Sequence, residues 1–213
     1  AGEFGVVQNV MVRLTVGVEA HTHEYIATAH EDQKFGLSLA TGDAMTAVRR
    51  VFAADNLRLV GLHSHIGSQI FDLSPFEGAL RSLASLGDFR SYNLGGGLAA
   101  AYTAQDRPPS YPEYAAAKAG ALESVFGPGH RLLDEPGRAL VANGCVTLYS
   151  VESVKRNVDT YVAVDGGMSD NLRPMLYGAR YEAQIADRFG GGTACHLVGK
   201  HCESGDILIR DAD

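Results

Sequence analysis

Short runs of apolar, β-prone residues alternate with amphipathic segments along the first two thirds of the chain. The apolar runs predict strands at residues 10–16, 35–39, 57–65, 92–94 and 131–134. Apolar residues at helical spacing predict helices over residues 44–52, 74–86 and 110–126. Strand followed by helix, repeated in this way, is the pattern of a parallel sheet that helices cover. The sequence therefore predicts an α/β fold with five such strands up to Asp134.

Two of the predicted helices begin with the same polar signature. Ser74 stands three residues before Glu77, with Pro75 at the first helical position, and Ser110 stands three residues before Glu113. A serine followed three residues later by glutamate is typical of a capping box, in which each side chain satisfies a free backbone N–H of the other residue. We therefore expect capping boxes at the starts of both helices.

The alternation of strands and helices stops after Arg138. Runs rich in β-prone residues follow at 146–154, 160–164, 196–198 and 207–209, and no strong helical pattern separates them. Pro174 limits any helix between Arg173 and Tyr177 to a short turn, around a Leu-Met-Leu set that the pattern predicts to be buried. We expect an α/β domain over residues 1–143 and a β-rich domain segment over residues 144–213.

Composition and charge narrow the class of protein. The chain has 213 residues, 46% of them apolar and 20% charged, which favours a packed core over disorder. No apolar run approaches the roughly 20 residues of a membrane helix, and no secretory signal is present. A net charge of −7 without a basic stripe argues against nucleic acid as a partner. The chain begins with Ala1 rather than Met, so we expect a partial chain.

The three cysteines are an odd number and form no C-x-x-C pair, which fits a reducing cytoplasm better than a disulfide scaffold. Cys145 and Cys195 are consistent with small buried apolar residues. Cys202 differs because it lies among ionisable residues, where Lys200 and His201 could favour its thiolate form.

Polar and glycine residues gather at the ends of three predicted strands, in residues 63–69, 93–97 and 134–138. Ligands of parallel α/β proteins bind at the carboxyl ends of strands. Glycine lets the backbone approach a ligand and turn its N–H groups toward an anion. These three segments together predict a cup that binds a phosphate group.

Charged and imidazole side chains add chemistry to the same segments. Glu135 and Arg138, three residues apart, form either a local surface ion pair or a carboxylate and a guanidinium that face a ligand, and their place at a strand end favours the ligand. His63 and His65 share one face of a strand and could form half of a metal site. His21 and His23 offer a second pair, which we expect in a solvated loop, and no convincing set of further ligands is evident.

Five motifs, in order along nearly the whole chain, carry a resemblance to a known family. They are residues 61–69, 93–97, 135–138, 164–170 with 173–177, and 202–206. Together they resemble the diaminopimelate decarboxylases, which belong to the alanine-racemase-like, pyridoxal-phosphate-dependent (group IV) decarboxylases. The resemblance implies the C-terminal part of a cofactor-binding (β/α)8 TIM barrel in residues 1–143, followed by the start of a β domain. It implies conversion of meso-2,6-diaminopimelate to L-lysine and CO2.

The resemblance also implies roles in binding the cofactor, pyridoxal 5'-phosphate. His65 would pack against the cofactor ring, and Glu135 would sit at the pyridine nitrogen and keep it protonated, so that the ring accepts the electrons left by CO2. The phosphate would be held by small side chains and backbone groups, at Ser68, Gly96, Gly97, Gly137 and Arg138.

The implied substrate-binding residues lie on both sides of the expected domain boundary. Arg138, Arg173 and Tyr177 would grip the substrate carboxylates, for which a guanidinium is suited. Cys202 would return a proton to the substrate carbon, and Glu203 would bind the distal amino group. In the family these last two residues reach into the partner's site, which implies a homodimer with shared active sites.

Two family features have no counterpart in this sequence, the lysine that forms the Schiff base with the cofactor and a tyrosine near the C-terminus. The four lysines are Lys34, Lys118, Lys155 and Lys200. Lys118 follows Tyr114 in a segment that echoes the Tyr-Ala-x-Lys context, but it has one residue too many and falls within a predicted helix. We therefore expect little or no turnover from this chain alone.

Three alternatives remain open from the sequence. One is a decarboxylase of the same fold that acts on ornithine, arginine or lysine. Another is a metal-dependent hydrolase with His63 and His65 as ligands, and the last is a non-catalytic remnant.

Overall fold

The computed structural model describes residues 1–18, 34–190 and 192–212. The chain divides into two compact units: Ala1–Ala100 with Arg107–Ala142, and Ala101–Asp106 with Asn143–Asp213. The chain therefore leaves the first unit at residue 101, returns to it at residue 107 and leaves it again at residue 143. His21 and His23 lie outside the described residues.

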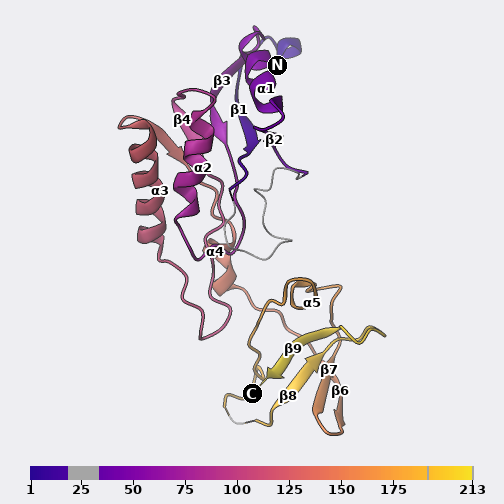
Figure 1. Cartoon of the computed structure of the whole chain (residues 1–213). Helices are drawn as coiled ribbons and strands as arrows, with labels where there is room; N and C mark the ends of the chain where they lie inside the picture. The colour runs from indigo at the N-terminus through magenta and orange to yellow at the C-terminus, as the bar shows by residue number, and fades with distance from the viewer. Residues whose placement is uncertain (19–33, 191, 213) are drawn as a thin grey trace. The chain divides into compact units, whose positions relative to one another are not determined.

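A parallel sheet forms the centre of the first unit (Figure 1). Among the described residues its strands lie in the order β2-β1-β3-β4-β5, and every neighbouring pair is parallel. This confirms the five predicted strands, whose bounds are β1 Gln8–Thr15, β2 Leu37–Ser38, β3 Leu57–His63, β4 Ser91–Asn93 and β5 Arg131–Leu133.

Three helices pack on this sheet because each has an apolar face at helical spacing. They are α1 (Asp43–Phe52), α2 (Pro75–Ala84) and α3 (Tyr111–Phe126), followed after β5 by the short α4 (Arg138–Val141). Leu62 and Tyr92 from the sheet and Phe76 from α2 are fully buried in one core cluster. Phe76 meets Tyr114 of α3 edge to face, at 5.7 Å between ring centroids. Single-turn 3-10 helices occur at Gly2–Phe4 and Ala142–Gly144.

The two predicted capping boxes have different outcomes. At Ser110 both reciprocal hydrogen bonds with Glu113 are present, so this prediction is confirmed. At Ser74 the prediction is wrong, because its side chain makes no capping bond and its hydroxyl donates to Asp72 at 2.8 Å. Ser74 itself has helical backbone angles, φ −59 and ψ −32, whereas a capping serine is usually extended, and both its N–H and its hydroxyl donate to Asp72.

The second unit contains a mixed sheet (Figure 1). Its described strands lie in the order β6-β7-β8-β9, with bounds Val151–Arg156, Thr160–Val164, Cys195–Val198 and Ile207–Ala212. The pair β7 and β8 is parallel, and the other two pairs are antiparallel. The helix α5 (Arg173–Tyr177) is a short turn, as Pro174 predicts.

Some expectations for the second unit are wrong. The run predicted from residue 146 becomes a strand only at Val151, and Val146 is 87% exposed. Met175, of the set expected to be buried, is 45% exposed, and Cys145 is exposed. Apolar character alone therefore does not predict burial in this unit.

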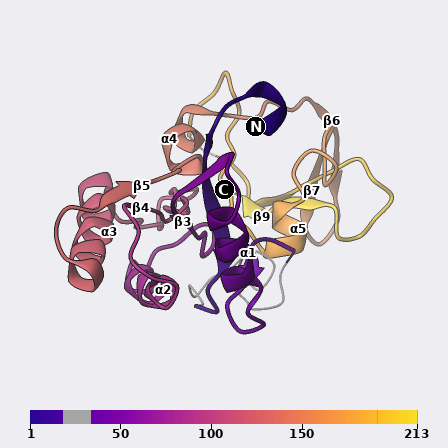
Figure 2. The ribbon, with the colours of Figure 1, turned by 90° about the horizontal axis from the view of Figure 1, so that it is seen from above.

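Residues 101–106 belong to the second unit through contacts with the segment that follows α5. The rings of Tyr102 and Tyr181 lie 5.0 Å apart, and the backbone N–H of Ala104 donates to Glu182 at 2.6 Å. Figure 2 gives a view of both units from above. In the described ranges, none of the helices has the length and apolar character needed to cross a bilayer.

Candidate active site

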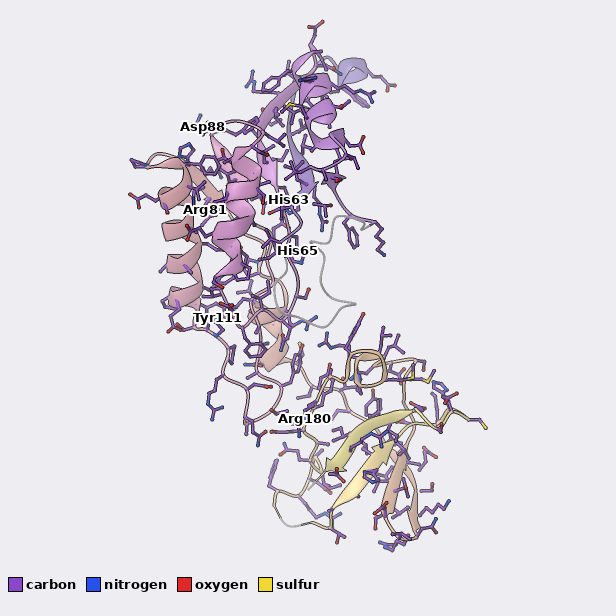
Figure 3. All side chains as sticks on the ribbon, in the orientation of Figure 1. His63, His65, Arg81, Asp88, Tyr111 and Arg180 are labelled. Carbon is purple, nitrogen blue, oxygen red and sulfur yellow. The ribbon has the colours of Figure 1, made fainter. Side chains whose placement is uncertain are left out.

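Three strands of the first unit end in register, and this brings their following loops together. His63 of β3 pairs with Asn93 of β4, which pairs with Leu133 of β5. Backbone bonding continues past the strands, since the N–H of Glu135 donates to the carbonyl of Gly95 at 3.0 Å. His65 lies just beyond β3 (Figure 3) and accepts a hydrogen bond at Nδ1 from the N–H of Gly96, at 3.2 Å. The loops after β3, β4 and β5 thus meet at one edge of the sheet.

The turn Gly95–Gly97 is pressed between the two neighbouring loops. Gly95 has φ +62 and Gly97 has φ +105, conformations that favour glycine. A Cβ at Gly95 would lie 2.5 Å from His65 Nδ1, and a Cβ at Gly96 would lie 2.2 Å from the carbonyl oxygen of Glu135. A side chain at these positions would push the loops apart, so glycine is required for their close approach.

Glu135 presents a carboxylate that is held at one oxygen and accessible at the other. Its Oε1 accepts a hydrogen bond from the side-chain amide of Asn93 at 2.7 Å, and Oε2 lies 3.9 Å from His63 Nε2, beyond hydrogen-bond length. The Glu135 side chain is 56% exposed, whereas His63 Nε2 is buried and has no hydrogen-bond partner in the described structure. The carboxylate is therefore oriented by Asn93 and able to accept a further proton donor.

Both histidines at this edge favour the neutral form. Burial lowers the pKa of both His63 and His65. At His63 the charge of Glu135 opposes this lowering by more than Arg13 adds to it, whereas at His65 the lowering of the pKa by Arg13 is larger than the raising by Glu135. A neutral His65 agrees with its geometry, because a nitrogen that accepts the N–H of Gly96 carries no proton.

Residues after β3 and β5 complete this edge. Gln69, at φ +60, binds both backbone groups of Ala100 with its side-chain amide, and its Oε1 also accepts from Arg138 Nη1 at 3.4 Å. The loop is tied to the glycine turn as well, since the N–H of Ile70 donates to the carbonyl of Gly97 at 2.8 Å. The residues predicted to bind the phosphate all lie in the first unit: Ser68, Gly96, Gly97, Gly137 and Arg138. The side chain of Ser68 is half-buried.

Four of the predicted site residues belong instead to the second unit: Arg173, Tyr177, Cys202 and Glu203. Arg173 lies between aromatic rings, with its guanidinium carbon 5.6 Å from the ring centre of Tyr102 and 5.7 Å from that of Tyr177. Its Nε donates to the hydroxyl of Tyr181 at 2.8 Å. These contacts fix the direction of the guanidinium within the unit.

The loop that carries Cys202 and Glu203 is held by a buried carboxylate. Asp206 is 3% exposed and accepts hydrogen bonds from the N–H groups of Met168 at 2.6 Å and His201 at 2.9 Å. A Cβ at Gly199 would lie 2.2 Å from Asp206 Oδ2, so glycine leaves room for this carboxylate. Cys202 itself is exposed.

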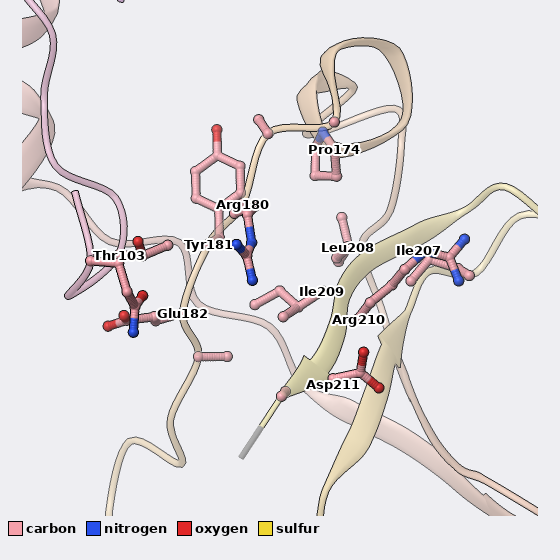
Figure 4. A pocket seen from close by; sticks show the side chains of 15 residues that line it. Thr103, Pro174, Arg180, Tyr181, Glu182, Ile207, Leu208, Ile209, Arg210 and Asp211 are labelled. Atoms are coloured by element: carbon pink, nitrogen blue, oxygen red, sulfur yellow. The ribbon is translucent and has the colours of Figure 1, made fainter. Parts of the chain in front are cut away.

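The second unit has a cavity of about 680 Å³ that is lined mainly by residues 178–183 and 207–212. Figure 4 shows the side chains that line it. None of the predicted substrate-binding residues lines it. Across residues 1–18, 34–190 and 192–212, no group of three or more His, Cys, Asp or Glu side chains could hold a metal ion.

Three residues that organise the first site were given no role by the sequence: Asn93, Gln69 and Lys118. Asn93 is a polar residue between the apolar Tyr92 and Leu94 of a predicted strand, two residues before Gly95, and this was the available signal. Gln69 gives no comparable signal, because its positive φ and its pairing with Ala100 depend on the fold. Lys118 stands four residues after Tyr114 on one helical face, which hints at a shared environment.

Known proteins resemble the chain in sequence and in fold. Residues 2–142 match the family described as pyridoxal-dependent decarboxylase, pyridoxal binding domain. A curated diaminopimelate decarboxylase from Mycobacterium tuberculosis is 54% identical over 238 residues, which cover 99% of this chain and 53% of the relative. The chain thus spans about half the length of the curated relatives it matches.

Solved structures agree. The diaminopimelate decarboxylase from Helicobacter pylori in complex with L-lysine has a TM-score of 0.83 and 29% identity, over 99% of this chain and 54% of that one. The enzyme from M. jannaschii, also with L-lysine, has a TM-score of 0.80 and 31% identity, over 99% and 51%. These similarities confirm the predicted resemblance and fold class, while the roles of individual residues stay predictions.

Proposed function

The chain belongs to the pyridoxal-dependent decarboxylase family, and from this premise we propose that it serves the conversion of meso-2,6-diaminopimelate to L-lysine and CO2. The observation that carries the proposal is the convergence of Glu135, His65 and the turn Gly95–Gly97 at one edge of the sheet. The diaminopimelate decarboxylase names of the relatives, and the L-lysine bound to two of the solved ones, support this substrate and product.

The residues at this edge fit pyridoxal 5'-phosphate. Glu135 offers an accessible carboxylate oxygen to a protonated ring nitrogen, and the buried, unpartnered His63 Nε2 lies beside it. The side-chain-free turn at Gly95–Gly97 leaves backbone next to the loop that bears Ser68. When bound, the cofactor supplies an electron-poor ring that accepts the electron pair left by departing CO2. Glu135 holds the proton on the ring nitrogen, and a carboxylate positioned by Asn93 is suited to this task.

The remaining residues of the first unit orient the ligand. His65 would cover one face of the ring, and its lowered pKa keeps it from adding a positive charge to the site. The phosphate is held by side-chain and backbone groups of Ser68, Gly96, Gly97, Gly137 and Arg138. Burial of the loops behind them excludes water from that side of the site.

Residues of the second unit act on the amino acid. Arg173 and Tyr177, together with Arg138, bind the carboxylates of the substrate, because a guanidinium donates two parallel hydrogen bonds to a carboxylate. Glu203 binds the distal ammonium group. The thiol of Cys202 donates a proton to the carbon that has lost CO2, which leaves a thiolate that regains its proton from solvent.

We propose a homodimer in which Cys202 and Glu203 of one protomer complete the site of the other. Cys202 is exposed, as a residue that serves a neighbouring protomer has to be before assembly. We also propose a cytoplasmic location, supported by three cysteines that are all free.

Pyridoxine 5'-phosphate tests cofactor binding in this chain, because it lacks the aldehyde and needs no lysine. Isothermal calorimetry of the 213-residue chain should detect binding, and Glu135→Gln should weaken it at least tenfold. The matched control Glu77→Gln, on an exposed face of α2, should leave the affinity unchanged. Absence of binding by the unsubstituted chain would overturn the proposal.

Phosphopyridoxyl amino acids test the substrate, because they join the cofactor to the amino acid by a stable bond. The adduct of meso-diaminopimelate should bind more tightly than the adducts of ornithine and arginine, and Arg173→Ala should reduce that preference. Tighter binding of the ornithine adduct would favour another basic amino acid as the substrate.

A further inference from the structure

The first unit buries one positive charge that the proposed chemistry does not use. Lys118 lies in the middle of α3 and is 1% exposed. An ammonium group is rarely buried unless its protons are all bound, because removal from water is costly. The surroundings of Lys118 therefore indicate what the group does.

The ammonium group of Lys118 has three protons and meets three acceptors. Nζ donates to the carbonyl oxygen of Gly95 at 3.1 Å, to the hydroxyl of Tyr114 at 2.5 Å and to the carboxylate of Asp134. The hydroxyl of Tyr114 in turn donates to Asp134 at 3.0 Å. The buried charge is therefore fully satisfied by this set.

Two aromatic rings close the remaining sides. Nζ lies 4.4 Å from the ring centre of Phe76 on α2 and 4.3 Å from that of Tyr114. Faces of aromatic rings attract cations, and they also exclude water from the group. Residues of both α2 and α3 therefore fix the position of Nζ at the end of the Lys118 side chain.

The acceptors of Lys118 belong to the two loops that form the candidate site. Gly95 begins the glycine turn, and Asp134 directly precedes Glu135. The carbonyl of Gly95 also accepts the N–H of Glu135, so both of its lone pairs are used. Lys118 thus joins the backbone of one loop to a side chain of the other from beneath the site.

We propose that Lys118 is a positioning residue that sets the spacing between the turn Gly95–Gly97 and Glu135, and thereby shapes the site for a phosphorylated pyridine. The inference rests on the proposed function for the ligand. The spacing of the two loops can be tested without any ligand.

The same geometry separates Lys118 from a lysine that reacts with the cofactor. All of its protons are bound beneath the turn, and its side chain is enclosed by Phe76 and Tyr114. Borohydride reduction of the chain after incubation with pyridoxal phosphate should leave no phosphopyridoxyl group on Lys118 in tryptic mass spectra. A stoichiometric adduct at this residue would contradict a purely positioning role.

The dependence of ligand affinity on pH distinguishes a charged, hydrogen-bonding Lys118 from a residue that only fills space. Burial lowers the pKa of Lys118 to about 8, against opposing effects of Asp134 and Glu135. Burial and the Asp134 charge raise the pKa of Tyr114, so it stays a phenol, and His65 stays neutral because its pKa is lowered. Above about pH 8 the amine keeps two protons for three acceptors, so one contact is lost.

Three variants of α3 test the proposal. Lys118→Met keeps the length of the side chain and removes the charge and the hydrogen bonds. Leu122→Ala, one turn further along the same helix at a residue 5% exposed, removes packing and leaves the contacts of Lys118 in place. Tyr114→Phe removes one of the three acceptors and keeps the ring, and it replaces Lys118→Met if that variant does not fold.

Hydrogen exchange reports the loops without a ligand. Exchange at Gly96 and at Glu135 should speed up at least tenfold in Lys118→Met relative to Leu122→Ala, when both are referred to their global stability. Equal exchange in the two variants would overturn the proposal, whether or not the chain binds a pyridoxine phosphate.

Affinity for pyridoxine 5'-phosphate reports the site. At pH 7, Lys118→Met should bind at least tenfold more weakly, and Leu122→Ala should bind as the unsubstituted chain does. Between pH 7 and about pH 9.5 the unsubstituted chain should lose several-fold more affinity than Lys118→Met, because only the unsubstituted chain has the Lys118 ammonium to deprotonate. Titration of the probe itself affects both chains equally and cancels in the comparison. An identical pH profile would overturn the proposal. If the unsubstituted chain does not bind, the proposed function fails and hydrogen exchange alone decides the role of Lys118.

Discussion

The two units of this chain support their candidate site residues in different ways. The first unit buries a continuous cluster in which Leu62, Phe76 and Tyr92 are fully enclosed. In the described part of the second unit, only Val164 and Leu208 are buried apolar residues, although its sheet has a similar number of strands.

This difference shows that burial of apolar surface is not the only means of fixing a functional loop. Behind the glycine turn of the first unit, a packed core and the buried Lys118 hold the backbone. Behind the loop of Cys202, the carboxylate of Asp206 gathers backbone N–H groups from two segments. We therefore expect packing changes to be costly in the first unit, and polar changes to be decisive in the second.

The largest expected effect comes from the core. Phe76→Ala should lower the free energy of unfolding of the first unit by about 3–5 kcal/mol, because it leaves a cavity beside Tyr114 and Lys118. Phe189→Ala, at a side chain of the second unit that is 75% exposed, should change the free energy of unfolding of the second unit by less than about 0.5 kcal/mol. Urea unfolding followed by circular dichroism measures both, and similar costs would remove the contrast between the units.

A smaller effect is expected at Asp206. Asp206→Asn should destabilise the second unit by about 1.5–3 kcal/mol, because hydrogen bonds to a charged acceptor are lost or weakened. Hydrogen exchange at Met168 and His201 should speed up, while exchange in the parallel sheet stays the same. Asp187→Asn is the control, since this carboxylate is largely exposed. Unchanged protection at Met168 would show that Asp206 does not hold the loop.

Acid should weaken the first unit through its two half-buried histidines, His63 and His65. Burial lowers the pKa of His63 and His65 below 6.5, so the unfolded chain binds more protons than the folded one as the pH falls below 6.5. Their contribution to stability is therefore lost as the pH drops from 6.5 toward the folded pKa values.

Thermal unfolding between pH 7 and pH 5 measures this loss, and the double variant His63→Gln, His65→Gln should show a shallower dependence on pH. The control His201→Gln, in the second unit, should keep the original slope. An equal slope in the double variant would assign the acid sensitivity to carboxylates.

The smallest effect belongs to the exposed ion pair of Arg81 and Glu77, one turn apart on α2. Glu77→Gln should change the free energy of unfolding by less than about 0.5 kcal/mol, because water and salt screen exposed charges. Urea unfolding at low and high salt checks this. A larger cost would mean that the pair takes part in the packing of α2.

The sequence predicted those features that depend on local pattern. The five parallel strands follow from their apolar runs, and the cap at Ser110 follows from a serine and a glutamate at fixed spacing. The convergence of Glu135 with His65 follows because parallel strands bring their carboxyl ends to one edge.

Features that depend on distant partners could not be predicted. Ser74 has the same local signature as Ser110, but its hydroxyl binds Asp72 instead. The hydrogen bond from Lys118 to Gly95 spans 23 positions of the sequence, and that from Asn93 to Glu135 spans 42. Such pairs exist only once the sheet has fixed the strand ends, so the residue types alone do not reveal them.

The excursion of residues 101–106 into the second unit has a consequence for anyone who divides this gene. A stop codon after Ala142 would preserve every strand of the parallel sheet, yet it would strip Tyr102 of Tyr181 and Ala104 of Glu182. The truncated product would carry an orphaned hexapeptide between Ala100 and Arg107, close in sequence to the glycine turn. Truncation after Ala142 would therefore leave residues 101–106 without their packing partners. A cleaner way to isolate the first unit is to end the chain at Ala142 and to replace residues 101–106 by a short, flexible glycine-serine linker.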